Sequence, residues 1–298
     1  MSVATDKHAL KKRIDRFLWD SNSVRTVELR RLLQDRFIPF GRVAIIGGMV
    51  RDFARSGREG FSSDVDLVID VPIEKVAALA TDLSADCNRF GGYSWSIGSW
   101  KIDFWAMEST WAYRAGHVDV GRLEDLTSCT FFDWDAILYD LGTKSIHCDR
   151  DYFDRLRRGQ LDINLMPTPS VNGNLLRAVR RILLWDLEAG PRLTEFIERH
   201  LDDDALSEIS ATDRRLYATS LVSGFRTTRL LLDHLKCKEE RLELATYYAR
   251  QLPLPGILDE DERDDPEASN RSETDRSRRG LRKTASARHR STEIIRNA

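Results

Sequence analysis

The amino-acid sequence predicts an α/β head domain with a small mixed sheet, followed by an all-helical neck and body and a disordered C-terminal tail. Between residues 41 and 150, short β-rich apolar runs alternate with helical patterns, which indicates strands and helices in one unit. From residue 151 to residue 253, only helical patterns are present. Residues 254–298 are charged, serine-rich and nearly free of large apolar side chains, so they cannot bury enough surface to offset their ordering entropy. A helical extension at residues 1–40 makes a fourth part.

Residues 1–40 carry two apolar helical stripes ahead of the head. The first stripe is Leu10, Ile14, Phe17 and Leu18, and the second is Val24, Val27, Leu33 and Phe37. Stripes of this kind cover one face of a helix. We expect two helices that serve either as packing for the head or as a surface for a protein partner.

The helical region has four strong apolar patterns, at Leu175–Leu187, Leu216–Val222, Leu230–Leu235 and Leu242–Leu252. The tail that follows has an acidic run at Asp259–Asp265 and a basic stretch at Arg271–Arg290. These opposite charges either attract each other or leave the basic part to contact RNA or a protein partner.

The most informative stretch of the chain begins with a strand that ends at two glycines. Val43–Ile46 is a short β-rich run that stops at Gly47-Gly48, and Met49–Arg55 continues as a helix. A helix that begins behind paired glycines presents free backbone N–H groups and a partial positive charge, which suits a phosphate. A Gly-Gly pair alone usually marks only a turn, so the order of strand, glycines and helix carries the prediction.

A second apolar run places two carboxylates beside this turn. Val65–Ile69 has the pattern of a strand, and because side chains alternate along a strand, Asp64 and Asp66 project from the same face. Two carboxylates at this spacing can hold a divalent cation beside a phosphate. A D-x-D triplet also arises by chance in a chain with 48 acidic residues, so it counts only together with the glycine turn. The two halves together predict phosphoryl or nucleotidyl transfer.

This segment resembles the signature GGxVRD…DxDxV of the head domain shared by bacterial CCA-adding enzymes and bacterial poly(A) polymerases, within the DNA-polymerase-β-like nucleotidyltransferases. Here the signature stands as Gly47-Gly48-Met49-Val50-Arg51-Asp52, then Asp64-Val65-Asp66-Leu67-Val68. The loop Ser56–Ser63 between the halves is a few residues longer than expected for the family. The resemblance covers about residues 40–185.

A third carboxylate follows on another predicted strand. Ser99–Met107 alternates polar and apolar residues, with Asp103 in its middle. A third aspartate on a neighbouring strand is what a two-metal site needs, because it reaches the metal that activates the attacking hydroxyl. By alternation alone, an ordinary exposed strand aspartate is an equally good interpretation, and the resemblance favours the functional one.

The next segment departs most from the family. Thr130–Asp140 resembles a degraded form of the block RRDFTINALAYD, in which the family's paired arginines fall on Cys129 and Thr130 and its asparagine on Asp135. One of those arginines normally helps to hold the nucleotide in the family. Their loss places standard nucleotide binding in question.

A later helix resembles the neck helix of the family. Asn174–Trp185 is similar to DPLRILRAVRFA, with Arg177 and Arg180 at the two nucleotide-contacting arginines. At positions i and i+3 they share a helical face and can reach one triphosphate, whereas the alternative is a solvated basic face. The acidic residue that precedes these arginines in the family is replaced by Val171-Asn172-Gly173.

The resemblance implies a metal-dependent nucleotidyltransferase that transfers NMP from an NTP to an acceptor hydroxyl and releases pyrophosphate. The implied catalytic and metal-binding residues are Asp64, Asp66 and Asp103, which would hold two Mg²⁺ ions. The implied nucleotide-binding residues are Gly47, Gly48, Arg51, Asp52, Asp135, Arg177 and Arg180. The implied acceptor is an RNA 3′ end, above all that of tRNA.

Two alternatives stay open. One keeps the chemistry but uses a protein, a small molecule or a selected tRNA as acceptor, as in a toxin or defence enzyme. The other is a pseudoenzyme that binds RNA or nucleotide without turnover. The family's base-reading motif has no clear copy, because Thr212-Asp213-Arg214-Arg215 is more simply an N-cap at the start of an apolar helix.

Composition is that of a cytoplasmic enzyme. The chain is 41% hydrophobic and 32% charged with a net charge of −2, so it does not simply coat nucleic acid. The four cysteines form no C-x-x-C pair, which predicts reduced thiols and no structural zinc site. No signal peptide and no membrane-spanning apolar run are evident. Basic clusters that could meet a phosphate backbone, or that are simply solvated, are Lys11-Lys12-Arg13, Arg30-Arg31, Arg155-Leu156-Arg157-Arg158 and Arg180-Arg181.

Overall fold

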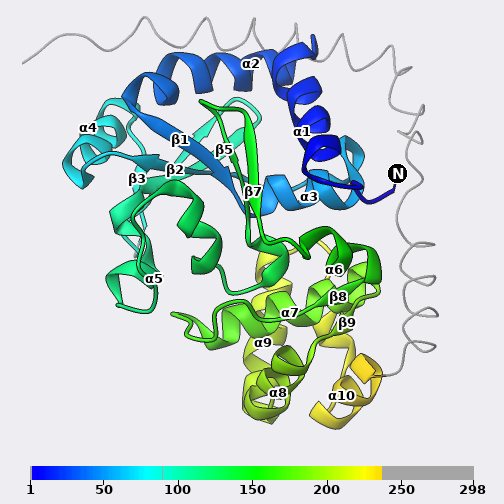
Figure 1. Ribbon diagram of the computed structural model, residues 1–298. Coiled ribbons are helices and arrows are strands. Elements are labelled where there is room, and N and C mark those ends of the chain that lie inside the picture. Colours follow the sequence, from blue (N-terminus) through cyan, green and yellow to red (C-terminus); the bar gives the residue numbers. More distant parts are fainter. Residues whose placement is uncertain (1, 89, 237–298) are drawn as a thin grey trace, which may run out of the picture. The chain divides into compact units, whose positions relative to one another are not determined.

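A seven-stranded mixed sheet organises the first part of the chain in the computed structural model, which describes residues 2–88 and 90–236 (Figure 1). Its strands are β1 Arg42–Ile46, β2 Val65–Asp70, β3 Asp86–Cys87, β4 Tyr93–Ile97, β5 Trp100–Ala106, β6 Ile137–Asp140 and β7 Ser145–Cys148. They lie in the order β3-β4-β5-β2-β1-β6-β7. The predicted α/β head with a mixed sheet is confirmed.

The register of two central strands positions the predicted acidic residues. β2 and β5 run parallel, and the other neighbouring pairs of this sheet are antiparallel. In the parallel pair Asp66 lies directly beside Asp103. Because side chains at matched positions of neighbouring strands point to the same face, both carboxylates leave the sheet on one side.

Helices α1 Lys7–Asp15, α2 Val24–Leu32, α3 Gly48–Ser56 and α4 Ile73–Leu83 belong to the main core on the other side of the sheet (Figure 1). Side chains of the alternate strand positions, such as Ile45, Leu67 and Phe104, are buried there with them. The chain continues from α1 and α2 through π-helical segments at Arg16–Asp20 and Leu33–Phe37 and a 3₁₀ turn at Ile38–Phe40.

The N-terminal extension is part of this core. Its apolar side chains Leu10, Ile14, Phe17, Leu18, Leu29, Leu33 and Phe37 are buried. Tyr139 of β6 donates a hydrogen bond to Asp15 at 2.6 Å, and the Trp100 ring nitrogen donates to the Arg25 carbonyl at 2.8 Å. The extension therefore packs on the head, as one of the two expectations had it, and a partner surface there stays a prediction. The second stripe is wrong at Val24, because this residue is the first of α2 and its side chain is 89% exposed.

A smaller apolar cluster covers part of the face that carries the two aspartates. Leu123 and Leu126, from the 3₁₀ segment Leu123–Cys129, pack with Ala44, Val68 and Leu138 of the sheet. The segment before it contains a 3₁₀ turn at Met107–Ser109 and α5 at Trp111–Arg114. This cluster leaves the neighbourhood of the acidic pair open.

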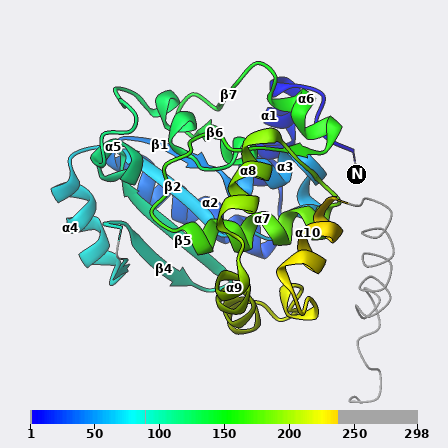
Figure 2. The same cartoon turned by 90° about the horizontal axis from the view of Figure 1, so that it is seen from below.

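The chain after β7 is mainly helical and lies below the sheet in the view of Figure 1 (Figures 1 and 2). Its helices are α6 Tyr152–Arg158, α7 Val171–Trp185, α8 Pro191–His200, α9 Asp203–Leu216 and α10 Thr228–Lys236. Helix α7 begins where the Ser170 hydroxyl accepts from the Gly173 N–H, and its Leu175, Val179 and Ile182 are buried. The described residues all belong to one compact unit, and the boundaries predicted near residues 40 and 150 fall inside it.

Several expectations for the helical region need correction. The two short strands β8 Gln160–Leu161 and β9 Glu188–Ala189 pair in parallel, so the region is not purely helical. The Leu216–Val222 pattern is not a helix, because α9 ends at Leu216 and a 3₁₀ turn begins only at Val222. The Leu230–Leu235 helix is confirmed within α10. The predicted helix Leu242–Leu252 and the tail at 254–298 lie outside the described residues.

Candidate active site

Asp66 and Asp103 open into a cleft of about 900 Å³ between the sheet and helix α7. The predicted residues that line it are Gly47, Gly48, Arg51, Asp64, Asp66, Asp103, Asp135, Arg177 and Arg180. Nine of the ten predicted site residues, all but Asp52, thus come together at one place. Lys101 and Arg181 also line the cleft and were not predicted.

The acidic pair is electrostatically costly. Burial raises the pKa of Asp66 to about 7, and the negative charges of Asp103, Asp64 and Asp135 add to the increase. The Oδ1 atom of Asp103 is buried and has no hydrogen-bond partner among the described residues. The pair therefore has room for a cation as a further partner.

Lys101 already supplies one cation at this place. It lies two residues before Asp103 on β5, and its ammonium donates to Asp64 and, at 3.4 Å, to Asp103 Oδ2. The signal was present in the sequence, because residues i and i+2 of a strand share a face.

The three aspartates fit divalent metal by their chemistry, although they are not gathered around one point. Among residues 2–88 and 90–236, no three acidic, histidine or cysteine side chains cluster as a metal site. Asp64, Asp66 and Asp103 nevertheless line one cleft with oxygen ligands of the kind that Mg²⁺ prefers. Asp66 and Asp103 are adjacent in the strand register, and Asp103 Oδ1 accepts no hydrogen bond from the part of the chain that the structure describes.

Steric demands favour glycine at both positions of the Gly47-Gly48 turn. Gly47 has φ +67°, a left-handed conformation that favours glycine, and its N–H donates to the Ile137 carbonyl at 2.9 Å. A Cβ on Gly48 would lie 2.9 Å from the Cβ of Ser63 and 3.7 Å from Asp66 Oδ2. The N-terminus of α3 thus approaches the acidic loop closely, and its N-cap, Gly47, has no side chain to occupy the free N–H groups.

Arg51 and Asp135 belong to a network of charges behind the turn. Arg51 donates to Asp135 at 2.6 Å and to Asp52 at 2.8 and 2.9 Å, and Arg181 donates to Asp135 at 2.8 Å. Burial alone would raise the pKa of Asp135, but the charges of Arg181 and Arg51 outweigh it and lower the pKa to about 2. The network joins α3 of the head to α7.

Asp52 has a different place from the one predicted. Its side chain is 1% exposed and is not among the residues that line the cleft. The carboxylate accepts from the Ser63 hydroxyl at 2.9 Å and from the Ser62 N–H at 3.4 Å. Asp52 therefore stabilises the loop that leads to Asp64 and does not face the predicted nucleotide site.

The two predicted arginines of α7 differ in their surroundings. Arg177 donates to the neutral amide oxygen of Asn174 at 3.3 Å. Arg180 is buried, pairs with Asp213, and donates to the Thr219 carbonyl at 3.0 Å. Its guanidinium also lies 3.6 Å from the ring centroid of Tyr217. Arg180 therefore ties α7 to the end of α9, while Arg177 is not paired with a carboxylate in these contacts.

The N-cap interpretation of Thr212–Arg215 is wrong. These residues lie near the end of α9, and the buried Asp213 accepts from the N–H groups of Leu221 at 2.7 Å and Val222 at 2.8 Å. The carboxylate stabilises the segment after the helix. Because Asp213 is fully buried, it cannot read a base edge.

The predicted basic clusters are largely used inside the protein. Arg13 donates to the Phe53 carbonyl at 3.1 Å, and Arg30 donates to the Leu18 carbonyl at 2.6 Å. Arg155 pairs with Asp149 at 2.9 Å. These three arginines are engaged within the protein, whereas Lys12, Arg31 and Arg158 are exposed, so contact of the basic clusters with a phosphate backbone stays a prediction.

A second cleft of about 720 Å³ joins the first along a shared wall that includes Asp66, Asp103 and Arg177. Its outer walls come from Phe90, Trp111, the loop at 167–170 and helix α9. The acidic pair therefore lies where two hollows join. A substrate in each hollow would meet its partner at these carboxylates.

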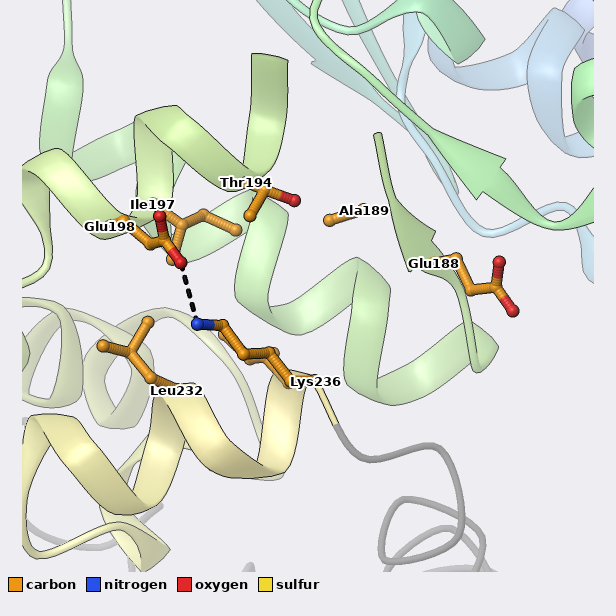
Figure 3. A pocket seen from close by; sticks show the side chains of 8 residues that line it. Glu188, Ala189, Thr194, Ile197, Glu198, Leu232 and Lys236 are labelled. Carbon is orange, nitrogen blue, oxygen red and sulfur yellow. Dashed lines mark ion pairs between the residues drawn. The ribbon is translucent and has the colours of Figure 1, made fainter. Parts of the chain in front are cut away.

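Another pocket, of about 270 Å³, lies between α8, β9 and α10 (Figure 3). Glu198 and Lys236 form an ion pair across it at 2.8 Å, beside Ile197 and Leu232. It shares no lining residue with the two clefts. None of the described helices combines the length and apolar character needed to cross a bilayer.

The sequence matches no protein-family model and no curated protein. Its fold is similar to solved structures of a CCA-adding enzyme with CTP (16% identity, TM-score 0.47) and with ATP (15%, 0.49), each over 76% of this chain and 53% of that one. The Thermotoga maritima CCA-adding enzyme complexed with tRNA is 17% identical at a TM-score of 0.45, over 84% of this chain and 55% of that one. This chain thus spans about half the length of these proteins. At such identities, activity does not transfer from one protein to another.

Proposed function

We propose that this protein is a metal-dependent nucleotidyltransferase that transfers NMP from an NTP to an acceptor hydroxyl and releases pyrophosphate. The observation that carries this proposal is the register of Asp66 beside Asp103 at the junction of two clefts, next to the glycine turn. Such an arrangement suits an in-line displacement in which one cleft holds the nucleotide and the other holds the acceptor.

The first cleft contains the groups that suit a triphosphate. The free N–H groups at the start of α3 lie beside Asp66, and Arg177 reaches the cleft from α7. Arg51 is engaged by two carboxylates, so its contribution is to orient the turn rather than to bind phosphate alone. The half-exposed Leu184 and Tyr217 line the same cleft and suit the flat face of a nucleobase.

Asp64, Asp66 and Asp103 would hold two Mg²⁺ ions, which when bound lower the pKa of the acceptor hydroxyl and offset the charge of the phosphates. Burial, and after it the charges of the neighbouring carboxylates, raise the pKa of Asp66, so its ionised form is costly at this place. A protein that only bound nucleotide would gain nothing from that cost, which disfavours the pseudoenzyme alternative.

An RNA 3′ end, above all that of tRNA, is the first acceptor to test, because the motifs resemble those of CCA-adding enzymes and poly(A) polymerases. The second cleft offers aromatic side chains for a terminal nucleoside, Phe90 and Trp111. A protein or small-molecule hydroxyl remains the alternative, supported by the replacement of the family's arginines by Cys129 and Thr130.

The experiment is to incubate the protein with each α-labelled NTP, Mg²⁺ and total cellular RNA, and in parallel with cellular protein and with small metabolites. Label should enter one class of acceptor, and Asp66→Asn and Asp103→Asn should abolish the transfer while keeping the fold. The proposal would be refuted if no class of acceptor became labelled with any of the four NTPs, or if transfer survived both substitutions.

A further inference from the structure

Lys101 stands among the residues to which the proposed function assigns the metal. Strand register places Ile102 beside Val65, so the preceding residues Lys101 and Asp64 are neighbours across the two strands. Lys101 and Asp103 share a face of β5 because they are two residues apart. The ammonium consequently contacts Asp64 and Asp103 together.

The contacts of Lys101 are of a kind that is easily exchanged. Its side chain is 48% exposed, and those of Asp64 and Asp103 are 46% and 27% exposed. Ion pairs at such exposure are weak because water screens them. A lysine ammonium on a four-carbon stem can also leave and return without movement of the backbone.

The arrangement of the carboxylates agrees with a cation already in place. The three aspartates line one cleft, yet no three acidic side chains of the described residues gather around a common point. Lys101 holds Asp64 towards itself, while Asp103 Oδ1 has no hydrogen-bond partner among those residues.

We infer that Lys101 is a resident counter-ion of the acidic site, that a divalent cation displaces its ammonium from Asp64 and Asp103, and that the released ammonium then contacts the anionic phosphates of the nucleotide. Lys101 is thus a positioning residue for the metal-free carboxylates, and the inference rests on the proposed function for its metal and nucleotide. The exchange keeps a cation beside Asp64 and Asp103 in both states, so neither state leaves these neighbouring carboxylates without a positive partner.

The test compares Lys101→Met and Lys101→Arg with the wild-type protein by titration of Mn²⁺ in a calorimeter, without and with a non-hydrolysable ATP analogue. Lys101→Met removes a competing cation, and since an exposed ion pair contributes up to about 1 kcal/mol, the apparent Mn²⁺ Kd should fall about two- to fivefold. Lys101→Arg keeps the charge and should bind Mn²⁺ within about twofold of the wild type. Nucleotide affinity should move in the opposite direction and weaken in Lys101→Met.

Lys75→Met is the matched control, since Lys75 is exposed on α4 and lines neither cleft. It should leave both affinities unchanged. Mn²⁺ affinity that is equal or weaker in Lys101→Met overturns the inference and leaves the proposed function standing. Absence of Mn²⁺ binding in the wild type and in Lys101→Met alike, with and without nucleotide, overturns both.

Discussion

Arg177 and Arg180 are three residues apart on one helix, yet the structure predicts opposite consequences for their removal. Arg180→Ala leaves the carboxylate of Asp213 buried without its charged partner and also removes the bond to the Thr219 carbonyl and the contact with the Tyr217 ring. Breaking a buried pair from one side costs about 3–5 kcal/mol in the free energy of unfolding. Asp213 keeps its bonds from the Ser220 hydroxyl and the Leu221 and Val222 N–H groups, so about 3 kcal/mol is the appropriate value.

For a unit of this size, about 3 kcal/mol corresponds to a fall in Tm of about 6–12 °C. Arg177→Ala should leave Tm within about 2 °C of the wild type, because its bond to Asn174 is a single partly exposed contact. In transfer assays, Arg177→Ala should instead raise the nucleotide KM at least tenfold, since a charge-assisted contact with phosphate contributes about 1.5–3 kcal/mol.

The measurements are thermal unfolding followed by circular dichroism and NTP titration of the transfer rate below the Tm of both variants. The double variant Arg180→Met with Asp213→Asn should recover part of the lost stability, because no buried charge is left unpaired. An Arg180→Ala protein with unchanged Tm and a tenfold higher nucleotide KM would refute the structural role and restore the sequence-based expectation that both arginines bind nucleotide.

Three further outcomes follow from the same site. Burial raises the pKa of Asp66 in the folded protein to about 7, above the ordinary value of an aspartate, so the folded protein holds an extra proton between these two pH values and its unfolding free energy falls as pH rises through this window. Asp66→Asn should remove up to about 4 kcal/mol of that decline, measured by urea unfolding in chelator from pH 4.5 to 8. Gly48→Ala should cost about 1–3 kcal/mol and most of the transfer activity, because its Cβ meets Ser63, and Ser63→Gly in the same chain should restore both. Asp135→Asn should lower the unfolding free energy by about 3–5 kcal/mol, seen as a lower Tm, because Arg51 and Arg181 lose the carboxylate that they share.

Local chemistry accounts for what could be predicted from the sequence. The glycine turn lies where expected, between β1 and α3, because the steric demands of Gly47 and Gly48 are local. Alternation predicted a common face for Asp64 and Asp66, and both side chains line the first cleft. The adjacency of β2 and β5 is a long-range property that only the resemblance to a known head domain made predictable, and their parallel direction was not predicted.

Long-range partners account for what could not be predicted. Helical periodicity predicts which arginines of α7 share a face. It does not predict that Arg180 pairs with Asp213, 33 residues away, or that Arg181 pairs with Asp135, 46 residues away. The same limit explains Asp52, whose carboxylate binds Ser63 rather than facing the cleft. In each case the pairing depends on which side chains lose their water together, and a short sequence motif does not contain that information.

The commitment of these arginines changes how the proposed triphosphate must be held. Arg51 and Arg181 share Asp135, and Arg180 is paired with Asp213, so three of the cleft's arginines are already neutralised. The remaining attraction for an anionic nucleotide comes from the N–H groups of α3, from Arg177, and from whichever cation occupies the acidic pair. A site of this composition places most of its positive charge in an exchangeable partner rather than in fixed side chains. In the wild-type chain, where Lys101 is present, a divalent cation at the acidic pair and a bound nucleotide should therefore each strengthen the binding of the other.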